Sequence, residues 1–227
     1  MISLLTISLT LFTINTVKAD TMNYLAGNSL VENNLAENDL AENDLPREGV
    51  FKPIMDDLAK RFSKQLSEYV IIIVASEQKQ YLLHHGQLLQ EYTISTSEFG
   101  TGNKANSNKT PLGVHLISQK YGDNAKIGTI FKSRANTGRV AKILTEEGQR
   151  SKADNVTSRI LWLSGLEKGI NKGRSIDSHK RYIYIHGTDE EGRLGVPASH
   201  GCIRMRNQEV INLYERVPIG TLVVILP

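Results

Sequence analysis

Hydrophobic residues define a first group of predicted elements in the first half of the chain. The continuous β-branched run 69–75 predicts a buried strand. Two shorter apolar segments, 80–84 and 88–95, follow across polar turns, a spacing typical of a β-meander. Before them, residues 53–68 repeat apolar side chains every four positions, which predicts a helix with Pro53 in its first turn. These apolar positions are Ile54, Leu58, Phe62 and Leu66.

Strand patterns return in the second half, separated by polar stretches. The apolar segments that predict strands there are 113–118, 158–163, 181–185 and 221–226. Residues 97–110 are rich in Gly, Asn, Ser, Thr and Lys and predict a loop. Residues 120–158 are weakly periodic, and such a long irregular stretch inside a domain is often a functional lid. We expect Asn207 to cap a helix over 208–216. Its inner face would carry Val210, Ile211 and Tyr214. This element order predicts a mainly β, sandwich or barrel-like domain with a few short helices.

The chain before residue 51 has a different composition. An apolar core followed by small residues predicts a cleaved secretory signal over residues 1–19, hence an exported protein. An uncleaved anchor is the alternative, but the apolar run is shorter than the ~20 residues that span a bilayer. Residues 20–50 include four five-residue units (LAGNS, LVENN, LAEND, LAEND) and are interpreted as an acidic, flexible segment. Residues 51–68 then form a helical lead-in to a domain over 69–227. An interaction module built from the repeats is less favoured. Each coil of a solenoid takes several such five-residue repeats, and at least about three stacked coils are needed for stability, so four repeats are too few.

Charge is unevenly distributed along the chain. Residues 20–45 hold six acidic residues and no Lys or Arg, whereas residues 46–227 hold 26 basic and 18 acidic residues, a net charge of +8. A basic domain suits an anionic partner such as a carboxylate-rich polymer, a membrane surface or nucleic acid. The sequence has no basic block interleaved with aromatic residues, so a nucleic-acid partner is not expected.

Cys202 is the single cysteine, so the chain cannot form an internal disulfide. In an exported protein a free thiol is exposed to oxidation, which suggests that the thiol has a use. The alternative is a small, buried apolar residue.

Candidate chemistry is concentrated in residues 182–206, YIYIHGTDEEGRLGVPASHGCIRMR. The predicted strand here ends on His186, and Gly201 permits a sharp turn just before Cys202. A thiol beside an imidazole has a lowered pKa and is an effective nucleophile, so this pair suits a covalent acyl-transfer enzyme. Backbone amides around Gly201 and Cys202 are candidate oxyanion donors.

Two imidazoles compete for the role of base. His200 is only two residues from Cys202 on a tight turn, whereas His186 approaches from a separate strand. The carbonyl of Gly187 is placed to orient the His186 ring, in place of the usual Asp or Asn. We therefore favour His186 as the base and His200 as a residue that shapes the site.

The flanking residues are given supporting roles. Ser199 is expected to provide hydrogen-bond support, and Arg204 to bind a substrate carboxylate. Four other histidines are interpreted as structural: His84, His85, His115 and His179. A metal site built from the thiol and the two nearby imidazoles would lack a fourth ligand with recognisable spacing. We therefore expect no metal and no cofactor.

The HGT motif at 186–188 and the run SHGCIRM at 199–205 resemble the signature of the YkuD-type L,D-transpeptidase catalytic domain, a family of cysteine peptidoglycan transpeptidases. The resemblance extends to the turn at 76–80, to His85-Gly86 and to TPLG at 110–113, and it covers about residues 69–226. It implies a YkuD-like β-sandwich fold for a catalytic domain over 69–227. By position it carries over Cys202, His186, Ser199, His200, Gly201 and Arg204. One branch of the family has Asn at the position of Arg204, which leaves substrate preference open.

The resemblance implies chemistry on peptidoglycan stem peptides in the periplasm or cell envelope. Cys202 would attack the carbonyl of the L-centre of the third stem residue, and D-Ala would leave with a proton from His186. An amine of another stem, or of a wall-linked protein, would then take the acyl group from the sulfur. Carbapenem-type β-lactams would acylate the same sulfur. A hydrolase on the same scaffold, acting as an L,D-carboxypeptidase or endopeptidase, and a non-catalytic wall-binding protein are the alternatives.

Overall fold

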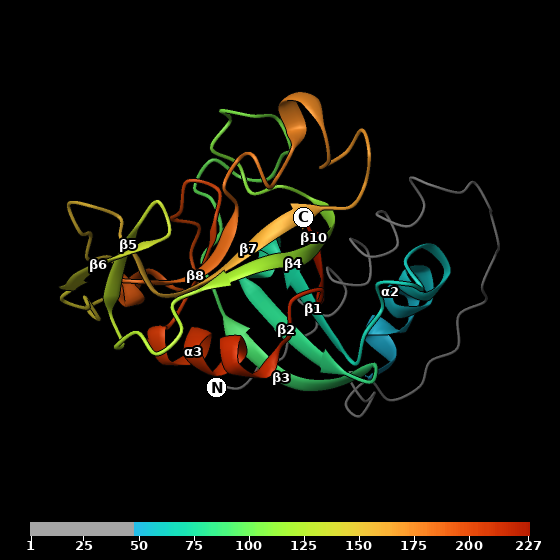
Figure 1. The fold of residues 1–227 in the computed structure, drawn as a ribbon, viewed down its shortest axis with the longest axis horizontal. Helices are drawn as coiled ribbons and strands as arrows, with labels where there is room; N and C mark the ends of the chain where they lie inside the picture. The colour runs from blue at the N-terminus through green and yellow to red at the C-terminus, as the bar shows by residue number, and fades with distance from the viewer. Residues whose placement is uncertain (1–47) are drawn as a thin grey trace, which may run out of the picture.

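Ten strands form one hydrogen-bonded sheet in the computed structural model, which describes residues 48–227 (Figure 1). The strands are β1 (Tyr69–Val74), β2 (Lys79–His84), β3 (Gln87–Thr93), β4 (Gly113–Tyr121), β5 (Thr129–Lys132), β6 (Ala135–Val140), β7 (Val156–Gly165), β8 (Tyr184–Thr188), β9 (Ile203–Met205) and β10 (Leu222–Leu226). The two α-helices of this part of the chain are α2 (Glu48–Arg61) and α3 (Asn207–Arg216). Short 3₁₀ turns occur at Ala75–Glu77, Arg174–Ile176 and Glu191–Arg193.

The sheet follows the order β3-β2-β1-β10-β4-β7-β5-β6, and β8 and β9 extend from β7. Two pairs are parallel, β1 with β10 and β8 with β9, and the other pairs are antiparallel. The sheet curls around α3 (Figure 1). The predicted mainly β class is confirmed, in its barrel-like form, with one curled sheet.

Strand β1 is buried on both faces because nearly all of its residues are aliphatic. Ile71 and Ile73 pack in the core that includes Val210 and Leu213 of α3. Val70, Ile72 and Val74 pack on the opposite face, against Phe51, Ile54 and Leu58 of α2. The two helices therefore cover opposite faces of the sheet, and the continuous apolar run 69–75 is explained by burial on both sides.

The predicted helix over 53–68 lies earlier in the chain than expected. Helix α2 begins at Glu48, so Pro53 is inside the helix and not in its first turn, and the helix ends at Arg61. Arg61 is held there by a salt bridge to Asp57 and by another to the buried Glu167, each 2.7 Å long. The chain then turns through residues 62–66, which keeps the last two apolar side chains of the predicted stripe against the same core.

Asn207 is the first residue of α3 and not its cap; Arg206 occupies the cap position without a side-chain cap bond. The Asn207 side chain is buried and donates to the carbonyl of Thr188 at 2.7 Å, while its own oxygen accepts from the Thr157 hydroxyl at 2.6 Å. These bonds tie α3 to β7 and β8. The buried face of the helix includes Leu213 where Ile211 was predicted.

The irregular stretch predicted over 120–158 contains the antiparallel pair β5 and β6. Five of the six side chains of β6 are exposed, so the strand lacks the apolar alternation by which a strand is recognised. Strand β9 was not predicted, because it has only three residues.

The predicted signal over 1–19, and nearly all of the predicted acidic segment over 20–50, lie outside the described residues. Across residues 48–227, no helix combines the length and apolar character that a membrane span requires.

Candidate active site

Strands β8 and β9 place the candidate base and nucleophile on one face of the sheet. Ile185 pairs with Ile203, and both point into the core. Because side chains alternate along a strand, residues 184, 186, 202 and 204 face the other side. Cys202 therefore lies beside Tyr184 and diagonal to His186. His186 lies in the middle of β8, and not at its end as predicted.

The sulfur of Cys202 is held by two backbone groups of one segment. The amide of Tyr184 donates to Sγ over 3.4 Å, and the thiol donates to the carbonyl of Tyr182, also over 3.4 Å. Tyr184 is the first residue of β8 and Tyr182 lies in the turn just before it, so the chain entering β8 fixes the position of the sulfur.

The ring of His186 is 3 % exposed, and its Nδ1 lies 2.7 Å from the carbonyl of Gly187. This is the contact expected from the sequence. A carbonyl accepts only, so Nδ1 carries the hydrogen and the lone pair is left on Nε2. Gly187 has to be glycine, because a Cβ there would lie 2.6 Å from Asn207 Oδ1 and 2.8 Å from the carbonyl of Thr157.

The turn before the sulfur is held by Ser199. Its hydroxyl donates to the carbonyl of Cys202 at 2.6 Å and accepts from the amide of Gly201 at 3.2 Å. Gly201 has φ +124°, a conformation that favours glycine, as the predicted sharp turn requires. Its amide is already engaged by Ser199, so of the two predicted oxyanion donors the amide of Cys202 is the better candidate.

Arg204 was expected to bind a substrate carboxylate, and the structure gives it another role. The residue is 2 % exposed, and its partners are two carboxylates of the chain itself. One nitrogen bonds Glu190 at 2.8 Å and another bonds Asp154 at 2.5 Å. A guanidinium enclosed in this way positions protein segments and has no free face for a ligand.

His200 is the exposed member of the motif, with 52 % of its side chain accessible. Its Nδ1 bonds the carboxylate of Asp154 at 2.9 Å, and its ring lies 5.9 Å from that of Phe99. Burial raises the pKa of Asp154, but the charge of Arg204 and the hydrogen bond with His200 outweigh this effect and lower the pKa. Asp154 is therefore ionised and joins the exposed imidazole to the buried guanidinium.

The protonation state of the pair differs from the expected thiolate. Burial raises the pKa of the Cys202 thiol to about 11, against the opposing effect of the Tyr184 amide. Burial also lowers the pKa of His186 to about 4, against the opposing effect of the Gly187 carbonyl. Desolvation disfavours the charged form of each group. At neutral pH the resting pair is therefore a thiol and a neutral imidazole.

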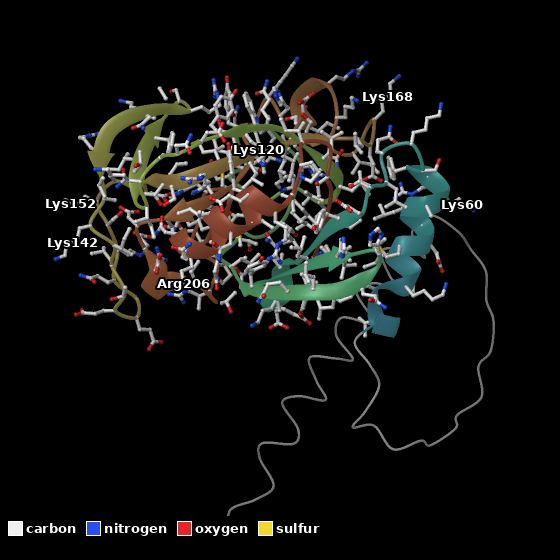
Figure 2. All side chains as sticks on the ribbon, turned by 60° about the horizontal axis from the view of Figure 1, so that its bottom comes forward. Lys60, Lys120, Lys142, Lys152, Lys168 and Arg206 are labelled. Atoms are coloured by element: carbon white, nitrogen blue, oxygen red, sulfur yellow. The ribbon has the colours of Figure 1, made fainter. Side chains whose placement is uncertain are left out.

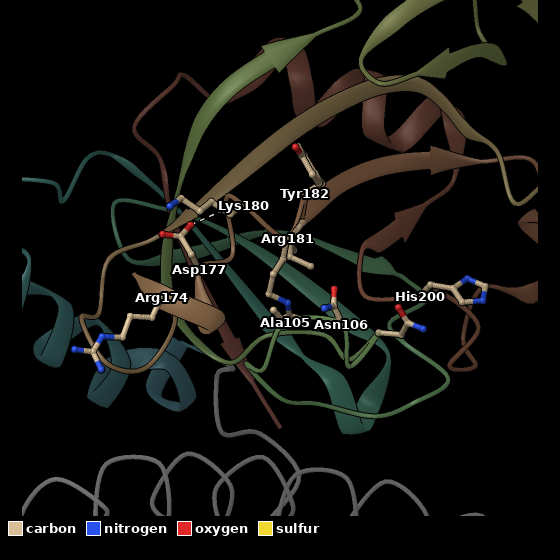
Figure 3. Close-up of a pocket in the computed structure, with 10 residues that line it drawn as sticks. Ala105, Asn106, Arg174, Asp177, Lys180, Arg181, Tyr182 and His200 are labelled. Carbon is tan, nitrogen blue, oxygen red and sulfur yellow. Dashed lines mark hydrogen bonds between the residues drawn. The ribbon is translucent and has the colours of Figure 1, made fainter.

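A pocket of about 250 Å³ lies next to the segment whose backbone holds the sulfur, and Cys202 itself is not among its lining residues (Figure 3). Its wall includes Tyr182 and Ile183, which belong to the segment that holds Sγ, and it also includes His200. The charged residues of the lining are Arg174, Asp177, Lys180 and Arg181. Three of these four are basic, so the pocket favours an anionic group. Elsewhere basic residues are dispersed, and those labelled in Figure 2 lie on different sides of the molecule.

An aromatic cluster flanks the sulfur on another side. Cys202 packs against buried Trp162 and Tyr184, and Trp162 stacks on His179 with ring centres 3.9 Å apart. Arg134, in the turn between β5 and β6, places its guanidinium 4.5 Å from the Trp162 ring and donates to the Tyr184 hydroxyl at 3.1 Å. The stretch predicted as a lid therefore reaches the site as a hairpin.

Sequence reasoning missed Arg134, Asp154, Arg181 and Glu190. Asp154 and Arg134 lie in the weakly periodic stretch 120–158, where no pattern distinguishes one charged residue from another. Arg181 directly precedes the segment 182–206. Its guanidinium donates to the carbonyl of Gly102 at 3.1 Å and to the carbonyl of Lys109. Its position next to the segment 182–206 was the one available signal.

The model of the YkuD family, the L,D-transpeptidase catalytic domain, matches residues 68–225. The protein named "Putative L,D-transpeptidase YqjB" of Bacillus subtilis is 51% identical over 45 residues, which cover 20% of this chain and 26% of that protein. The "Probable L,D-transpeptidase YbiS" of Escherichia coli is 46% identical over 41 residues, 18% of this chain and 13% of that protein. The matches span about a quarter or less of these relatives' lengths.

Solved structures show a weaker likeness. L,D-transpeptidase 3 from Mycobacterium tuberculosis, crystallised with a faropenem-derived adduct, aligns with a TM-score of 0.44 and 15% sequence identity. The alignment covers 70% of this chain and 60% of that one.

The neutral resting pair predicts a late appearance of the thiolate during pH titration. We expect the ultraviolet absorbance of the thiolate to be absent at pH 7 and to appear only as the pH approaches about 11, because burial raises the thiol pKa. Tyrosines ionise at about pH 10 and absorb in the same region, so the spectrum of Cys202→Ser is subtracted. A thiolate signal at pH 7 that disappears on acidification would identify a resting thiolate–imidazolium pair and overturn this assignment.

Proposed function

We propose, because the chain belongs to the YkuD family of L,D-transpeptidase catalytic domains, that it transfers acyl groups between peptidoglycan stem peptides through a thioester on Cys202. One observation carries the proposal. Cys202 lies in the turn directly before β9, and its sulfur is bonded by the amide of Tyr184, two residues before His186 on β8. The bond from Nδ1 of His186 to the Gly187 carbonyl leaves the Nε2 lone pair to act as the base. Strand β8 therefore positions both groups, which supports a geometry that is set before a substrate binds.

The first half-reaction begins from the neutral thiol. Sγ attacks the carbonyl carbon at the L-centre of the third stem residue while its proton passes to Nε2 of His186. The carbonyl oxygen takes the negative charge, and we assign the amide of Cys202 as a donor to it. The C–N bond to D-Ala then breaks, and the leaving amine takes the proton from the imidazolium.

The second half-reaction removes the acyl group from the sulfur. An acceptor amine gives its proton to His186 and attacks the thioester carbon, and the departing sulfur regains a proton from the imidazolium. The acceptor is a second stem or a wall-linked protein, reached after export to the periplasm or cell envelope. With water in place of the amine, the same thioester would give the hydrolase alternative.

Substrate carboxylates are assigned to the pocket, because Arg204 is enclosed. Stem peptides carry several carboxylates, and the exposed Arg174 and Lys180 line the pocket next to the segment that holds the sulfur. Arg181 is also basic, but it holds the 97–110 segment through its bonds to backbone carbonyls. The first two side chains are therefore the better candidates for substrate contact.

The central prediction concerns products formed from a disaccharide tetrapeptide. We expect the purified chain to release D-Ala and to form cross-linked dimers, detected by mass spectrometry, because an amine of one substrate resolves the thioester of another. Cys202→Ser should form no dimer, and His186→Gln should lower kcat by about 10²–10⁴-fold through loss of the base. Circular dichroism checks that both variants fold. Tripeptide monomers alone would contradict transfer and support hydrolysis.

The basic pocket predicts a selective change in substrate affinity. The double variant Arg174→Gln/Lys180→Gln should raise KM for the tetrapeptide about 2- to 10-fold and leave kcat nearly unchanged, since each exposed charge contributes up to about 1 kcal/mol. Lys60→Gln/Lys64→Gln, which changes two exposed lysines at the end of α2 and just after it, is the matched control for loss of two positive charges; Lys60 is labelled in Figure 2. An equal KM for both variants would remove the pocket from substrate recognition.

A carbapenem offers a strained carbonyl to the same nucleophile. We expect a covalent adduct on the folded chain with the added mass of the drug, located at Cys202 by peptide mapping. Cys202→Ser should remain unmodified, and His186→Gln should react more slowly because its thiol has lost the base. An unmodified wild-type chain would contradict the assigned nucleophile.

A further inference from the structure

A second cluster of titratable side chains lies apart from the sulfur, at the turn between β2 and β3. Glu68 directly precedes β1, His84 is the last residue of β2, and His85 follows in the turn. This end of the sheet lies beside α2, away from β5, β6 and β8 (Figure 1). In residues 48–227 this is the one group of three or more His, Cys, Asp or Glu side chains whose ligand atoms all lie within 4.8 Å of one another. Both histidines were interpreted as structural from the sequence.

The three side chains converge on one point. Nε2 of His84 lies 3.6 Å from Oε2 of Glu68, and Nε2 of His85 lies 3.9 Å from the same oxygen. In a tetrahedral zinc site with bonds of about 2.1 Å, ligand atoms lie about 3.4 Å apart. The side chains of Glu68, His84 and His85 are 51%, 37% and 70% exposed, respectively. They are therefore free to make the small shift in position that is needed to surround an ion.

The backbone fixes the three positions before any ion binds. The amide of His85 donates to the carbonyl of Glu68 at 2.7 Å. Tyr69, the neighbour of Glu68, pairs with His84 across the β1–β2 ladder, and its ring stacks on His84 with centres 4.7 Å apart. His85 has φ +49°, which brings its ring to 4.2 Å from that of His84. A preformed set of ligands loses little conformational entropy on binding.

We propose that Glu68, His84 and His85 bind one divalent transition-metal ion, with water completing its coordination. Two imidazoles and one carboxylate suit Zn²⁺ and its neighbours, whereas Mg²⁺ and Ca²⁺ prefer sites built from oxygen alone. The ion joins the start of β1 to the end of β2, and because it binds the folded hairpin it stabilises the fold. This site is independent of the acyl transfer proposed for Cys202.

The test measures Zn²⁺ binding by competition with a chromophoric zinc indicator, on the full chain without a histidine tag. Cys202→Ser serves as the parent, because it removes the one thiol that could bind zinc itself. We expect one Zn²⁺ per chain, a rise in the thermal unfolding midpoint with Zn²⁺, and no rise with Mg²⁺. His84→Gln, His85→Gln and Glu68→Gln should each weaken zinc binding by tenfold or more, because each removes a ligand.

Two control variants separate this site from other carboxylates and imidazoles. His200→Gln removes the exposed imidazole beside the catalytic face, and Glu215→Gln removes an exposed carboxylate of α3. Both should bind zinc as the parent does. The proposal is overturned if the parent binds no zinc, or if zinc binding survives the loss of His84 and His85. Loss of binding in His200→Gln alone would place the ion at the catalytic face and equally refute the hairpin site.

Discussion

The buried guanidinium of Arg204 connects the segments that surround the sulfur. It bonds Glu190 from the loop after β8 and Asp154 from the loop before β7, and Asp154 in turn holds His200. Removing one partner of such a pair leaves a buried charge uncompensated, at a cost of about 3–5 kcal/mol. Because Arg204 also lies opposite His186 in the β8–β9 ladder, the charge network and the candidate base share one strand pair. A substrate carboxylate would have to displace a partner already bound, which explains why cations exposed in the pocket are better suited to recognition.

Desolvation of the Cys202 thiol and the His186 ring has a chemical consequence. A stable thiolate would need a charged partner or solvent to balance it, and partial burial reduces access to solvent. In the proposed reaction the thiol therefore stays neutral until its proton passes to Nε2 of His186 during attack. A raised thiol pKa lowers the thiolate fraction, on which the rate of oxidation depends.

The pattern of residues was informative where burial and local turns decide the structure. The apolar side chains of residues 69–75 predict the buried strand, and the apolar spacing before residue 216 predicts the helix. The sharp turn at Gly201 follows from the backbone freedom of glycine. The sequence was uninformative where long-range contacts decide. Asn207 is a residue type that often caps helices, but its side-chain amide instead forms hydrogen bonds to Thr157 of β7 and Thr188 of β8. The exposed strand β6 carries no periodic signal, and Arg204 looks like a ligand for substrate until both of its carboxylate partners are known.

The central position of β10 has a consequence for biosynthesis. This strand lies between β1 and β4, pairing in parallel with the first and antiparallel with the second. A growing chain that has not yet reached residue 222 carries β1 and β4 with unpaired backbone edges, and open edges of this kind are templates for association with other chains. Parallel pairing between segments so distant in sequence is also slow to form. Vectorial synthesis therefore delays closure of the sheet until the last strand is made, and a newly made chain has most need of a chaperone in that interval.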